Sequence, residues 1–175
     1  AVGDGGTVLH YDGQTWRLED SGTTARLDTL HGHAGVLWAA GVDGAVLRRG
    51  ASGGWAEVPA PSGAWRGLWV SGPKEIWLAG AGGALVRGDV GDSTETTWTP
   101  AQSAAGAGFG ALWQASGDLW AVGGRGLMAR RREPEWRLVS YYQRGQPVDL
   151  LALWGEGETL FAAGALGTVF VLAAE

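Results

Sequence analysis

Two histidines, His31 and His33, have the spacing best suited to metal chemistry in this chain. On a β-strand, residues two apart point to the same face, and paired imidazoles of this kind occur at metal sites. His10 is the only other histidine, and the chain has no cysteine, which excludes disulfides, zinc–thiolate sites and thiol nucleophiles. We therefore expect no metal or other cofactor. We interpret His31 as a packing residue, because it replaces a tryptophan of the repeat described below.

Carboxylates offer two further kinds of chemistry. Asp89, Asp92 and Glu95 crowd one loop together with Ser and Thr residues, a composition that could bind Ca²⁺. Their spacing does not match the EF-hand, so we expect a solvated acidic loop. A glycosidase needs two carboxylates flanking the bond that it cleaves, and the nearest candidates, Asp28 and Asp149, are far apart in the sequence. We therefore predict a protein that is not an enzyme, with a glycoside- or sialic-acid-directed hydrolase as the alternative.

Side chains suited to binding gather in residues 140–147. Tyr141, Tyr142 and Arg144 supply the stacking and planar hydrogen-bonding surface that contributes most to protein interfaces. Trp65 is the one tryptophan of eleven that lies outside the repeat positions given below. We predict a binding site formed by the two tyrosines and the arginine, with Trp65 as an addition.

Bulk composition excludes several classes of function. The 175 residues are 45% hydrophobic and 18% charged, as in a globular protein, and the formal net charge of −5 argues against a nucleic-acid-binding surface. No apolar run approaches the roughly 18 residues that a membrane-spanning helix needs, so we expect no membrane insertion. The sequence begins with Ala1 and shows no signal peptide, and we expect a processed chain or a fragment.

A repeat of about 40 residues positions these side chains. Its clearest marker is a G-x-x-G element that returns after 38, 39, 43 and 41 residues, at Gly3–Gly6, Gly41–Gly44, Gly80–Gly83, Gly123–Gly126 and Gly164–Gly167. Four short apolar or alternating segments per unit, separated by Gly, Pro, Ser and Asp, are typical of the strands of a β-propeller blade. The G-x-x-G element is then a tight turn between the second and third strands, where glycine reaches positive φ without a Cβ clash.

The repeat predicts an all-β fold, namely a β-propeller of four-stranded antiparallel blades in a single domain of residues 1–175. We expect no helix longer than one turn. The units lie approximately at residues 1–26, 27–64, 65–108, 109–148 and 149–175. The first and last units hold three predicted strands each instead of four. We expect five blades with incomplete ends, or a segment of a larger propeller.

Ten of the eleven tryptophans follow the repeat. They occupy three positions, which are Trp16, Trp55, Trp98 and Trp136; Trp38, Trp77 and Trp120; and Trp69, Trp113 and Trp154. A tryptophan that returns at one strand position in successive blades is expected to pack between blades, where each ring buries roughly 150–250 Å². We interpret these ten rings as core residues and not as a ligand-stacking surface.

The pattern Leu-Trp, then Leu-Trp-Ala-Val-Gly-x-x-Gly, then a lone Trp resembles the Trp-rich propeller repeats of bacterial surface and secreted proteins. Those repeats are related to the bacterial-neuraminidase type and to the photosystem-assembly-factor propellers, and the resemblance covers essentially the whole chain. It implies a propeller fold and a secreted, periplasmic or cell-surface location. The Asp-box of neuraminidase repeats, S-x-D-x-G-x-T-W, is approached once, at Asp12-Gly13-Gln14-Thr15-Trp16, with one residue fewer.

The connections between successive blades differ in sequence from unit to unit, and variable loops on a repeated scaffold are where binding sites usually lie. Tyr141, Tyr142 and Arg144 belong to one of these connections. We therefore expect a non-catalytic binding or scaffold propeller that recognises a protein or glycan partner through this loop face. Exposed edge strands seek partners, so we also expect association with a second copy or another chain through the open propeller ends.

Overall fold

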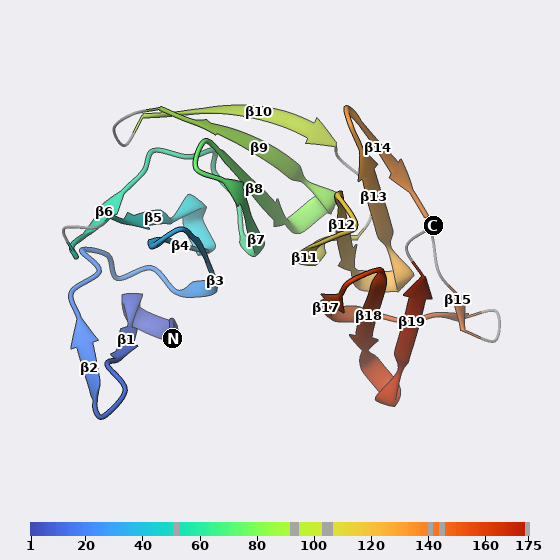
Figure 1. The fold of residues 1–175 in the computed structure, drawn as a ribbon, viewed down its shortest axis with the longest axis horizontal. Coiled ribbons are helices and arrows are strands. Elements are labelled where there is room, and N and C mark those ends of the chain that lie inside the picture. Colours follow the sequence, from blue (N-terminus) through green and yellow to red (C-terminus); the bar gives the residue numbers. More distant parts are fainter. Residues whose placement is uncertain (51–52, 92–94, 103–106, 140–141, 144–145, 174–175) are drawn as a thin grey trace. The chain divides into compact units, whose positions relative to one another are not determined.

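A computed structural model describes residues 1–50, 53–91, 95–102, 107–139, 142–143 and 146–173 (Figure 1). It divides into two compact units, Ala1–Trp77 with Arg87–Thr99 and Leu78–Val86 with Pro100–Glu175. Strands make up all regular structure in the described part, apart from five 3-10 turns of three residues each, so the predicted all-β class is confirmed. None of these short helices has the length and apolarity to cross a membrane.

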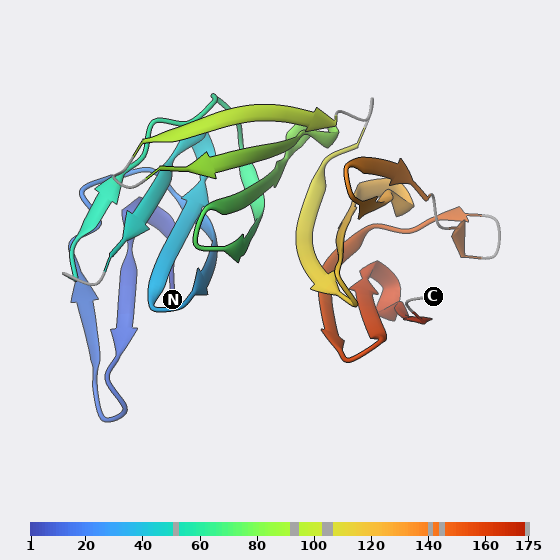
Figure 2. The same ribbon diagram turned by 45° about the horizontal axis from the view of Figure 1, so that its top comes forward.

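The strands form antiparallel sheets in which each strand pairs with its neighbour in the sequence (Figures 1 and 2). Three sheets have four strands each. The second sheet consists of β3 (Leu27–His33), β4 (Val36–Gly41), β5 (Val46–Arg49) and β6 (Trp55–Glu57), and the third sheet consists of β7 (Trp65–Gly72), β8 (Glu75–Gly80), β9 (Leu85–Val90) and β10 (Thr96–Gln102). The fourth sheet consists of β11 (Phe109–Ala115), β12 (Asp118–Gly123), β13 (Met128–Arg132) and β14 (Glu135–Leu138). The order of strands within each complete sheet is that of a propeller blade.

The sheets at the two ends of the chain are incomplete. The first sheet has β1 (Val8–Tyr11) and β2 (Trp16–Glu19), and the last sheet has β17 (Leu150–Glu156), β18 (Thr159–Gly164) and β19 (Val169–Ala173). An isolated bridge between Val2 and Val8 stands where the first unit was predicted to have a third strand, so that strand count is corrected. A separate hairpin, β15 (Tyr142–Gln143) with β16 (Gln146–Pro147), lies in the connection after the fourth sheet.

The G-x-x-G elements form the turns between the second and third strands of the repeat. They are the 3-10 segments η1 (Asp4–Gly6), η2 (Val42–Gly44), η3 (Ala81–Gly83), η4 (Gly124–Gly126) and η5 (Ala165–Gly167). The closing glycine is left-handed, as predicted, with φ of 77° at Gly44 and 70° at Gly126. The opening glycine is extended and is needed for space, because a Cβ on Gly123 would lie 1.9 Å from the carbonyl oxygen of Gly108.

Each sheet has two faces, and residues directly opposite each other in a strand pair share a face. We call the face toward the preceding sheet in the chain the rear face, and the face toward the next sheet the forward face. Leu47 packs with Val8 of the first sheet, so Leu47 marks the rear face of the second sheet. Val46, the neighbour of Leu47 in β5, lies opposite Ala40 and belongs to the forward face.

Apolar side chains fill the space between adjoining sheets. Within the second compact unit, the forward face of the fourth sheet supplies Ala115, Trp120, Val122 and Met128, which pack with Leu153, Leu160 and Ala162 from the rear face of the last sheet. Each of these side chains is nine-tenths or more buried. Burial of apolar surface is the main favourable term in folding, so this contact between successive sheets is the unit of stability in the repeat.

The exposure of the tryptophan side chains differs between the sheets. Trp38, Trp77 and Trp120 are 2%, 1% and 5% exposed, as expected for core residues. Trp16 and Trp154 are 60% and 51% exposed, so the interpretation of all ten rings as core residues is wrong for these two. Trp16 lies on the first sheet and Trp154 on the last.

Candidate functional site

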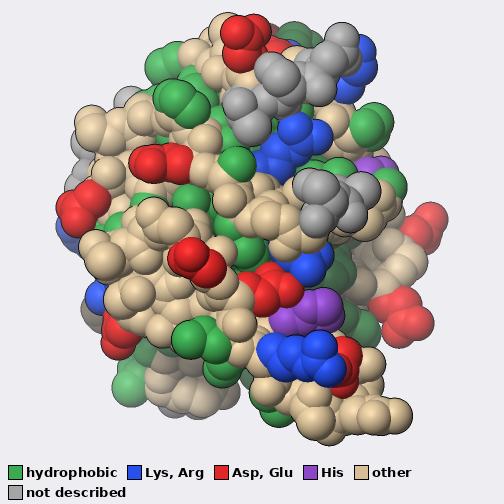
Figure 3. All heavy atoms as spheres, turned by 90° about the vertical axis from the view of Figure 1, so that its left-hand side faces the viewer, with side chains coloured by type: hydrophobic (Ala, Val, Ile, Leu, Met, Phe, Trp, Pro, Cys, Tyr) green, Lys and Arg blue, Asp and Glu red, His purple; other side chains and the backbone are tan. Residues whose placement is uncertain are grey.

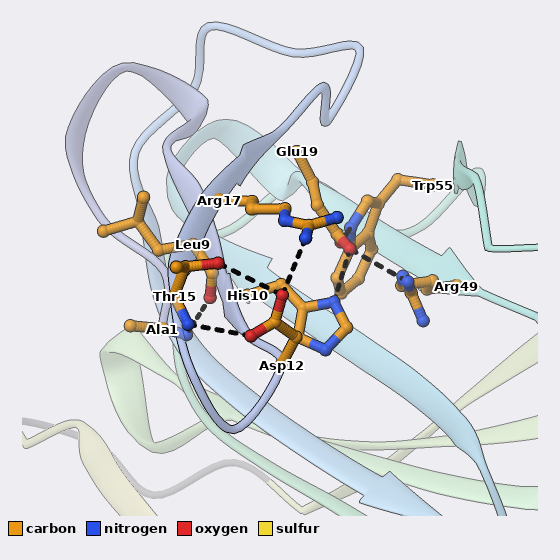
Figure 4. A network of polar contacts seen from close by, with 9 residues as sticks. All are labelled: Ala1, Leu9, His10, Asp12, Thr15, Arg17, Glu19, Arg49 and Trp55. Atoms are coloured by element: carbon orange, nitrogen blue, oxygen red, sulfur yellow. Dashed lines mark hydrogen bonds and ion pairs between the residues drawn. The ribbon is translucent and has the colours of Figure 1, made fainter.

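A carboxylate in the first sheet holds the outer strands of the first two sheets together (Figure 4). Glu19, at the end of β2, accepts hydrogen bonds at Oε1 from Arg49 Nη2 and His10 Nδ1, both at 2.9 Å. Its Oε2 accepts from the indole Nε1 of Trp55 at 2.8 Å. Arg49 and Trp55 belong to β5 and β6, so two of the three bonds cross from one sheet to the next. The carboxylate therefore fixes the position of the first sheet.

The environment of Glu19 keeps its carboxyl group ionised. Burial raises the pKa of Glu19, but the side-chain hydrogen bonds from Trp55, His10 and Arg49 together outweigh burial and hold the pKa below its usual value. A general acid needs a proton to give at the working pH, which requires a raised pKa. The arrangement therefore suits Glu19 to structural anchoring and not to proton donation.

A cavity of about 270 Å³ opens beside this network. It is lined mainly by apolar groups, which are Ala1, Val8, Leu9, Tyr11, Trp16, Leu30, Leu37 and Trp55, together with the polar groups of His10, Glu19 and Arg49. The rings of Tyr11 and Trp16 lie 5.1 Å apart between centroids with a tilt of 33°, and they are 49% and 60% exposed. Figure 3 shows this side of the molecule, where acidic, basic and histidine side chains lie side by side.

The hairpin turn between β1 and β2 presents Trp16 to solvent. Asp12 Oδ1 accepts from the backbone N–H groups of Thr15 at 2.8 Å and Gln14 at 2.9 Å, and Asp12 Oδ2 pairs with Arg17 at 2.9 Å. The backbone hydrogen bonds from Thr15 and then Gln14 lower the pKa of Asp12. This is the segment that approaches the neuraminidase Asp-box, and its aspartate serves here to close the turn before Trp16.

One face of the first sheet is an exposed apolar surface. Leu9 lies opposite Leu18 and Tyr11 opposite Trp16, so the four side chains share one face, which we call the first-sheet face. Leu9 is 37% and Leu18 is 73% exposed. Leu9 is the third residue after its G-x-x-G element, and the residue at that position in the second sheet, Leu47, is 1% exposed.

The forward face of the last sheet is the second exposed apolar surface. Strand pairing places Ala152, Trp154, Phe161, Ala163, Val169 and Val171 on one side, which we call the last-sheet face. Val169 and Val171 are each 65% exposed. Val169 is the second residue after its G-x-x-G element, and the equivalent residues Val46 and Met128 are 0% and 1% exposed. Val46 and Val169 are the same residue type at the same repeat position, yet Val46 is buried in the second sheet and Val169 is exposed in the last sheet.

The residues predicted from the sequence to bind a partner are not assembled by the described structure. Tyr141 and Arg144 lie outside the described residues. Tyr142 begins β15, where its backbone pairs with Pro147. Trp65 is 3% exposed and its indole Nε1 donates to the carbonyl of Pro61 at 3.3 Å, so this ring is a core residue with no accessible face for a ligand.

The histidine pair is part of the packing of the second sheet. His31 stacks on Trp69 with 4.1 Å between ring centroids, and its Nδ1 accepts the backbone N–H of Val70 at 3.0 Å. Burial lowers the pKa of His31, and the neighbouring His33 lowers it further. Among the residues that the structure describes, no group of three or more His, Asp or Glu side chains could hold a metal ion.

The carboxylates considered for hydrolysis or cation binding are engaged with their own surroundings. Asp28 pairs with Arg26 at 2.8 Å. Asp149 Oδ1 accepts the backbone N–H of Arg125 at 2.6 Å, which ties β17 to the η4 turn. Asp92 of the acidic loop lies outside the described residues. Asp28 and Asp149 thus have local structural roles.

Comparison with known proteins reveals the fold. No family model matches the chain, and no curated protein matches its sequence. A catalytically inactive virginiamycin B lyase from Staphylococcus aureus, solved with quinupristin, aligns with a TM-score of 0.77 and 18% identity over 99% of this chain and 64% of the lyase. YCF48 from Cyanidioschyzon merolae aligns with a TM-score of 0.74 and 19% identity over 98% of this chain and 62% of YCF48.

The computationally designed Ika4 protein aligns with a TM-score of 0.68 and 12% identity over 86% of this chain and 92% of the design. The virginiamycin B lyase and YCF48 structures are β-propellers, and at these identities the likeness shows the fold alone. This protein therefore has a β-propeller fold built from four-stranded antiparallel blades. The chain spans less than two thirds of the length of the lyase and YCF48 chains that it matches. A role of this propeller as a non-catalytic scaffold is compatible with these similar structures, although virginiamycin B lyase is named as an enzyme.

Sequence reasoning missed the two exposed apolar faces. It assigned Trp16 and Trp154 to the core because they share a register with buried rings. A signal was present in the repeat: the fourth residue after the G-x-x-G element is Arg48 in the second unit and Val171 in the last.

Proposed function

We propose that this propeller is a non-catalytic binding module that recognises a protein partner through the first-sheet face. The observation that carries the proposal is the exposure of Leu9, Tyr11, Trp16 and Leu18 on one side of a two-stranded sheet. Contiguous apolar surface of this kind marks interaction sites on folded proteins. Its two aromatic side chains, Tyr11 and Trp16, are of the residue types that contribute most binding energy at interfaces.

A charged group at the edge of the first-sheet face supports a protein interface. Asp12, in the turn that follows Tyr11, forms an exposed ion pair with Arg17. Charged and polar groups usually surround the apolar part of a protein–protein interface. The three donors on Glu19 hold its carboxylate ionised, which favours anchoring over acid catalysis in this region. The hydrolase alternative would need a different pair of carboxylates.

The proposal is tested by capture with a matched variant. Tagged wild type and a Trp16→Ala/Leu18→Ser variant are each incubated with an extract of the source cells, and captured proteins are compared by quantitative mass spectrometry. We expect at least one protein, untagged copies of this chain included, to be depleted on the variant. Because both substituted side chains are more than half exposed, the variant should melt close to the wild-type temperature.

Three further measurements sharpen the result. Tyr141→Ala/Tyr142→Ala serves as the parallel variant, because the loop of residues 140–147 is the binding surface that the sequence predicts. Loss of the partner from the tyrosine variant alone would assign binding to that loop and refute the first-sheet face. A glycan array that binds wild type and not the Trp16 variant would make the ligand a carbohydrate. Turnover of chromogenic glycosides by wild type would overturn the non-catalytic proposal.

A further inference from the structure

We infer that the contact between the second and third sheets is a pH-sensitive joint, in which a second proton on the His31 ring releases the backbone N–H of Val70. The joint lies within the first compact unit, where β3 carries His31 and β7 carries Val70. It involves no residue of the first-sheet face and does not depend on the proposed function. Acid would loosen β3 from β7 at this point, which makes the joint a regulatory element of the fold.

His31 joins the two sheets by one hydrogen bond and one stacked ring. Its Nδ1 accepts the N–H of Val70 at 3.0 Å, and its ring lies 4.1 Å from the ring of Trp69 with 30° between the planes. Val70 is 5% exposed. Among the described strands, β7 stands at the edge of the third sheet next to β8, so N–H groups on its other side need acceptors from elsewhere. The second sheet supplies the acceptor for Val70 through His31.

The hydrogen bond determines where the ring carries its proton. A backbone N–H only donates, so Nδ1 of His31 must be unprotonated and the neutral ring carries its hydrogen on Nε2. A second proton goes to Nδ1, which then becomes a donor that faces another donor. The N–H of the buried Val70 loses its acceptor, which is unfavourable. A cation over an indole is itself favourable, so Trp69 can hold the charged ring, but this contact cannot restore the lost bond.

The immediate surroundings of His31 also disfavour its charged form. Burial lowers the pKa of His31, and His33, two residues further along β3, lowers it more. Strand β4 places Trp38 opposite His31, and Arg48 of β5 lies over the Trp38 ring at 5.6 Å. The closest strands of the second sheet therefore offer His31 an aromatic ring and further basic groups.

The two carboxylates on the described strands β3, β4, β7 and β8 are already paired. Asp28 of β3 pairs with Arg26 at 2.8 Å, and Glu75 of β8 pairs with Arg87 at 2.8 Å. The other charged groups of β7 and of the turn that follows it are the cations Arg66 and Lys74. Like charges disfavour the addition of a proton, so these elements supply no carboxylate that would stabilise a charged His31.

The repeat provides an internal comparison for this joint. His31 takes the position that tryptophan occupies in the three later units. In the second compact unit, Trp113 at this position lies against the last sheet, because a Cβ on Gly155 would lie 2.8 Å from the indole Nε1. Gly155 is the repeat equivalent of Val70, since each follows the tryptophan of its strand. An indole N–H donates and does not titrate, so we expect this second contact to be insensitive to pH.

Hydrogen exchange of the Val70 amide, followed by NMR on the whole chain, provides the readout. The measurement runs from about pH 7.5 to about pH 5, the range in which histidine titrates. After correction for the intrinsic exchange rate, the protection of Val70 should be constant above the ordinary pKa of 6.5. Below that pH it should fall by up to about tenfold per pH unit, which is the slope for one proton taken up on opening. The nitrogen shifts of the neutral His31 ring should place its hydrogen on Nε2.

Low concentrations of urea distinguish a local joint from unfolding of the whole chain. The most protected amides of a protein exchange only when all of it unfolds, and their exchange rises steeply with urea because much surface becomes exposed. Opening of the joint exposes little surface. Exchange at Val70 should therefore be faster than at the most protected amides and should depend less on urea.

Two substitutions separate hydrogen bonding from titration. His31→Asn places an amide oxygen near the position of Nδ1, so this variant can accept from Val70 and has no proton to gain. The protection of Val70 should then be independent of pH. His33→Asn removes the neighbouring histidine and keeps the joint, so the pH dependence should remain. Melting temperatures close to wild type at neutral pH show that both variants are folded, and His31→Gln replaces His31→Asn if the latter is not.

Four results would overturn the inference. The first is a Val70 protection that does not change with pH in wild type. The second is a Val70 amide with the same protection and urea dependence as the most protected amides, which would indicate unfolding of the whole chain. The third is a pH dependence that persists in His31→Asn, and the fourth is a neutral His31 ring with its hydrogen on Nδ1. The capture experiment with the Trp16→Ala/Leu18→Ser variant tests the proposed function separately from all four.

Discussion

Replacing Glu19 by alanine is the sharpest perturbation of the contact between the first two sheets. The carboxylate accepts one hydrogen bond from Arg49 and one from Trp55, both side chains of the second sheet. Removing it leaves a guanidinium and an indole N–H without their acceptor. The cost of leaving donors unsatisfied exceeds the net value of the bonds themselves, so the variant reports on the whole network.

The magnitude follows from the geometry and the exposure. The donor–acceptor distances are 2.9 Å for Arg49 and 2.8 Å for Trp55. The side chains of Glu19 and Arg49 are 19% and 20% exposed, so water screens the pair only in part. A hydrogen bond to a charged group contributes about 1.5–3 kcal/mol and an exposed ion pair about 0–1 kcal/mol. We expect Glu19→Ala to lower the free energy of unfolding by about 2–3 kcal/mol.

Thermal unfolding followed by circular dichroism measures this change. For a chain of this length, each kcal/mol shifts Tm by about 2–4 °C, so a decrease of about 4–12 °C is expected. Asp28→Asn, which disturbs an exposed pair with Arg26, should shift Tm much less. A double-mutant cycle of Glu19→Ala with Arg49→Ala should be clearly non-additive. Unchanged Tm in Glu19→Ala, or additive effects in the cycle, would refute the role assigned to the network.

Acidification should remove this contribution. The pKa of Glu19 is lower in the folded protein than its ordinary value of 4.5, so the unfolded chain binds more protons in the interval between the two values. The stabilisation is therefore present above pH 4.5 and is lost as the pH falls through the folded-state value. The difference in stability between wild type and Glu19→Gln should shrink over the same interval.

Three further predictions concern packing and backbone space. Burial lowers the pKa of His31 below its ordinary value of 6.5, so the unfolded chain binds more protons just below that pH and the protein should become less stable there. In melting curves recorded at a series of pH values, His31→Gln should abolish this pH dependence of stability. Trp120→Ala should lower the free energy of unfolding by about 3–5 kcal/mol, because this ring is buried. Trp154→Ala should lower it much less, because that ring is half exposed. Equal decreases for the two variants in denaturant titrations would refute the burial argument. Gly123→Ala should lower the free energy of unfolding by about 3 kcal/mol or more, because its Cβ would lie 1.9 Å from a carbonyl oxygen. Gly110→Ala should leave the free energy of unfolding nearly unchanged in the same titration, because no atom lies within 4 Å of the added Cβ.

Much of the fold follows from local sequence. The G-x-x-G period gives the number and order of the repeat units, because a tight turn with a left-handed residue and a close backbone approach both favour glycine. Alternating and short apolar segments between these turns give the strands. The sheets of the structure lie within the residue ranges of the predicted units, although the first sheet has two strands where three are predicted.

The candidate site could be predicted only in part. Trp65 was selected because it lies outside the repeat registers, yet it is 3% exposed, because a position outside the repeat is not thereby a surface position. The predicted loop residues Tyr141 and Arg144 lie outside the described part of the chain. Tyr11 and Leu18, which form the exposed face beside Trp16, carry no feature in the sequence that marks them as surface residues.

What the sequence determined by itself was therefore the repeat: its period, its turns, its strands and the positions that face a neighbouring sheet. These are properties of short segments, set by backbone sterics and by the alternation of side chains along a strand. Only the tertiary structure decided which of those positions are covered. Burial depends on a second surface, and Trp16 at 60% exposure differs from Trp120 at 5% because a sheet packs over one ring and none over the other. The same physical reason makes the exposed first-sheet face the place where this protein meets a partner in our proposal.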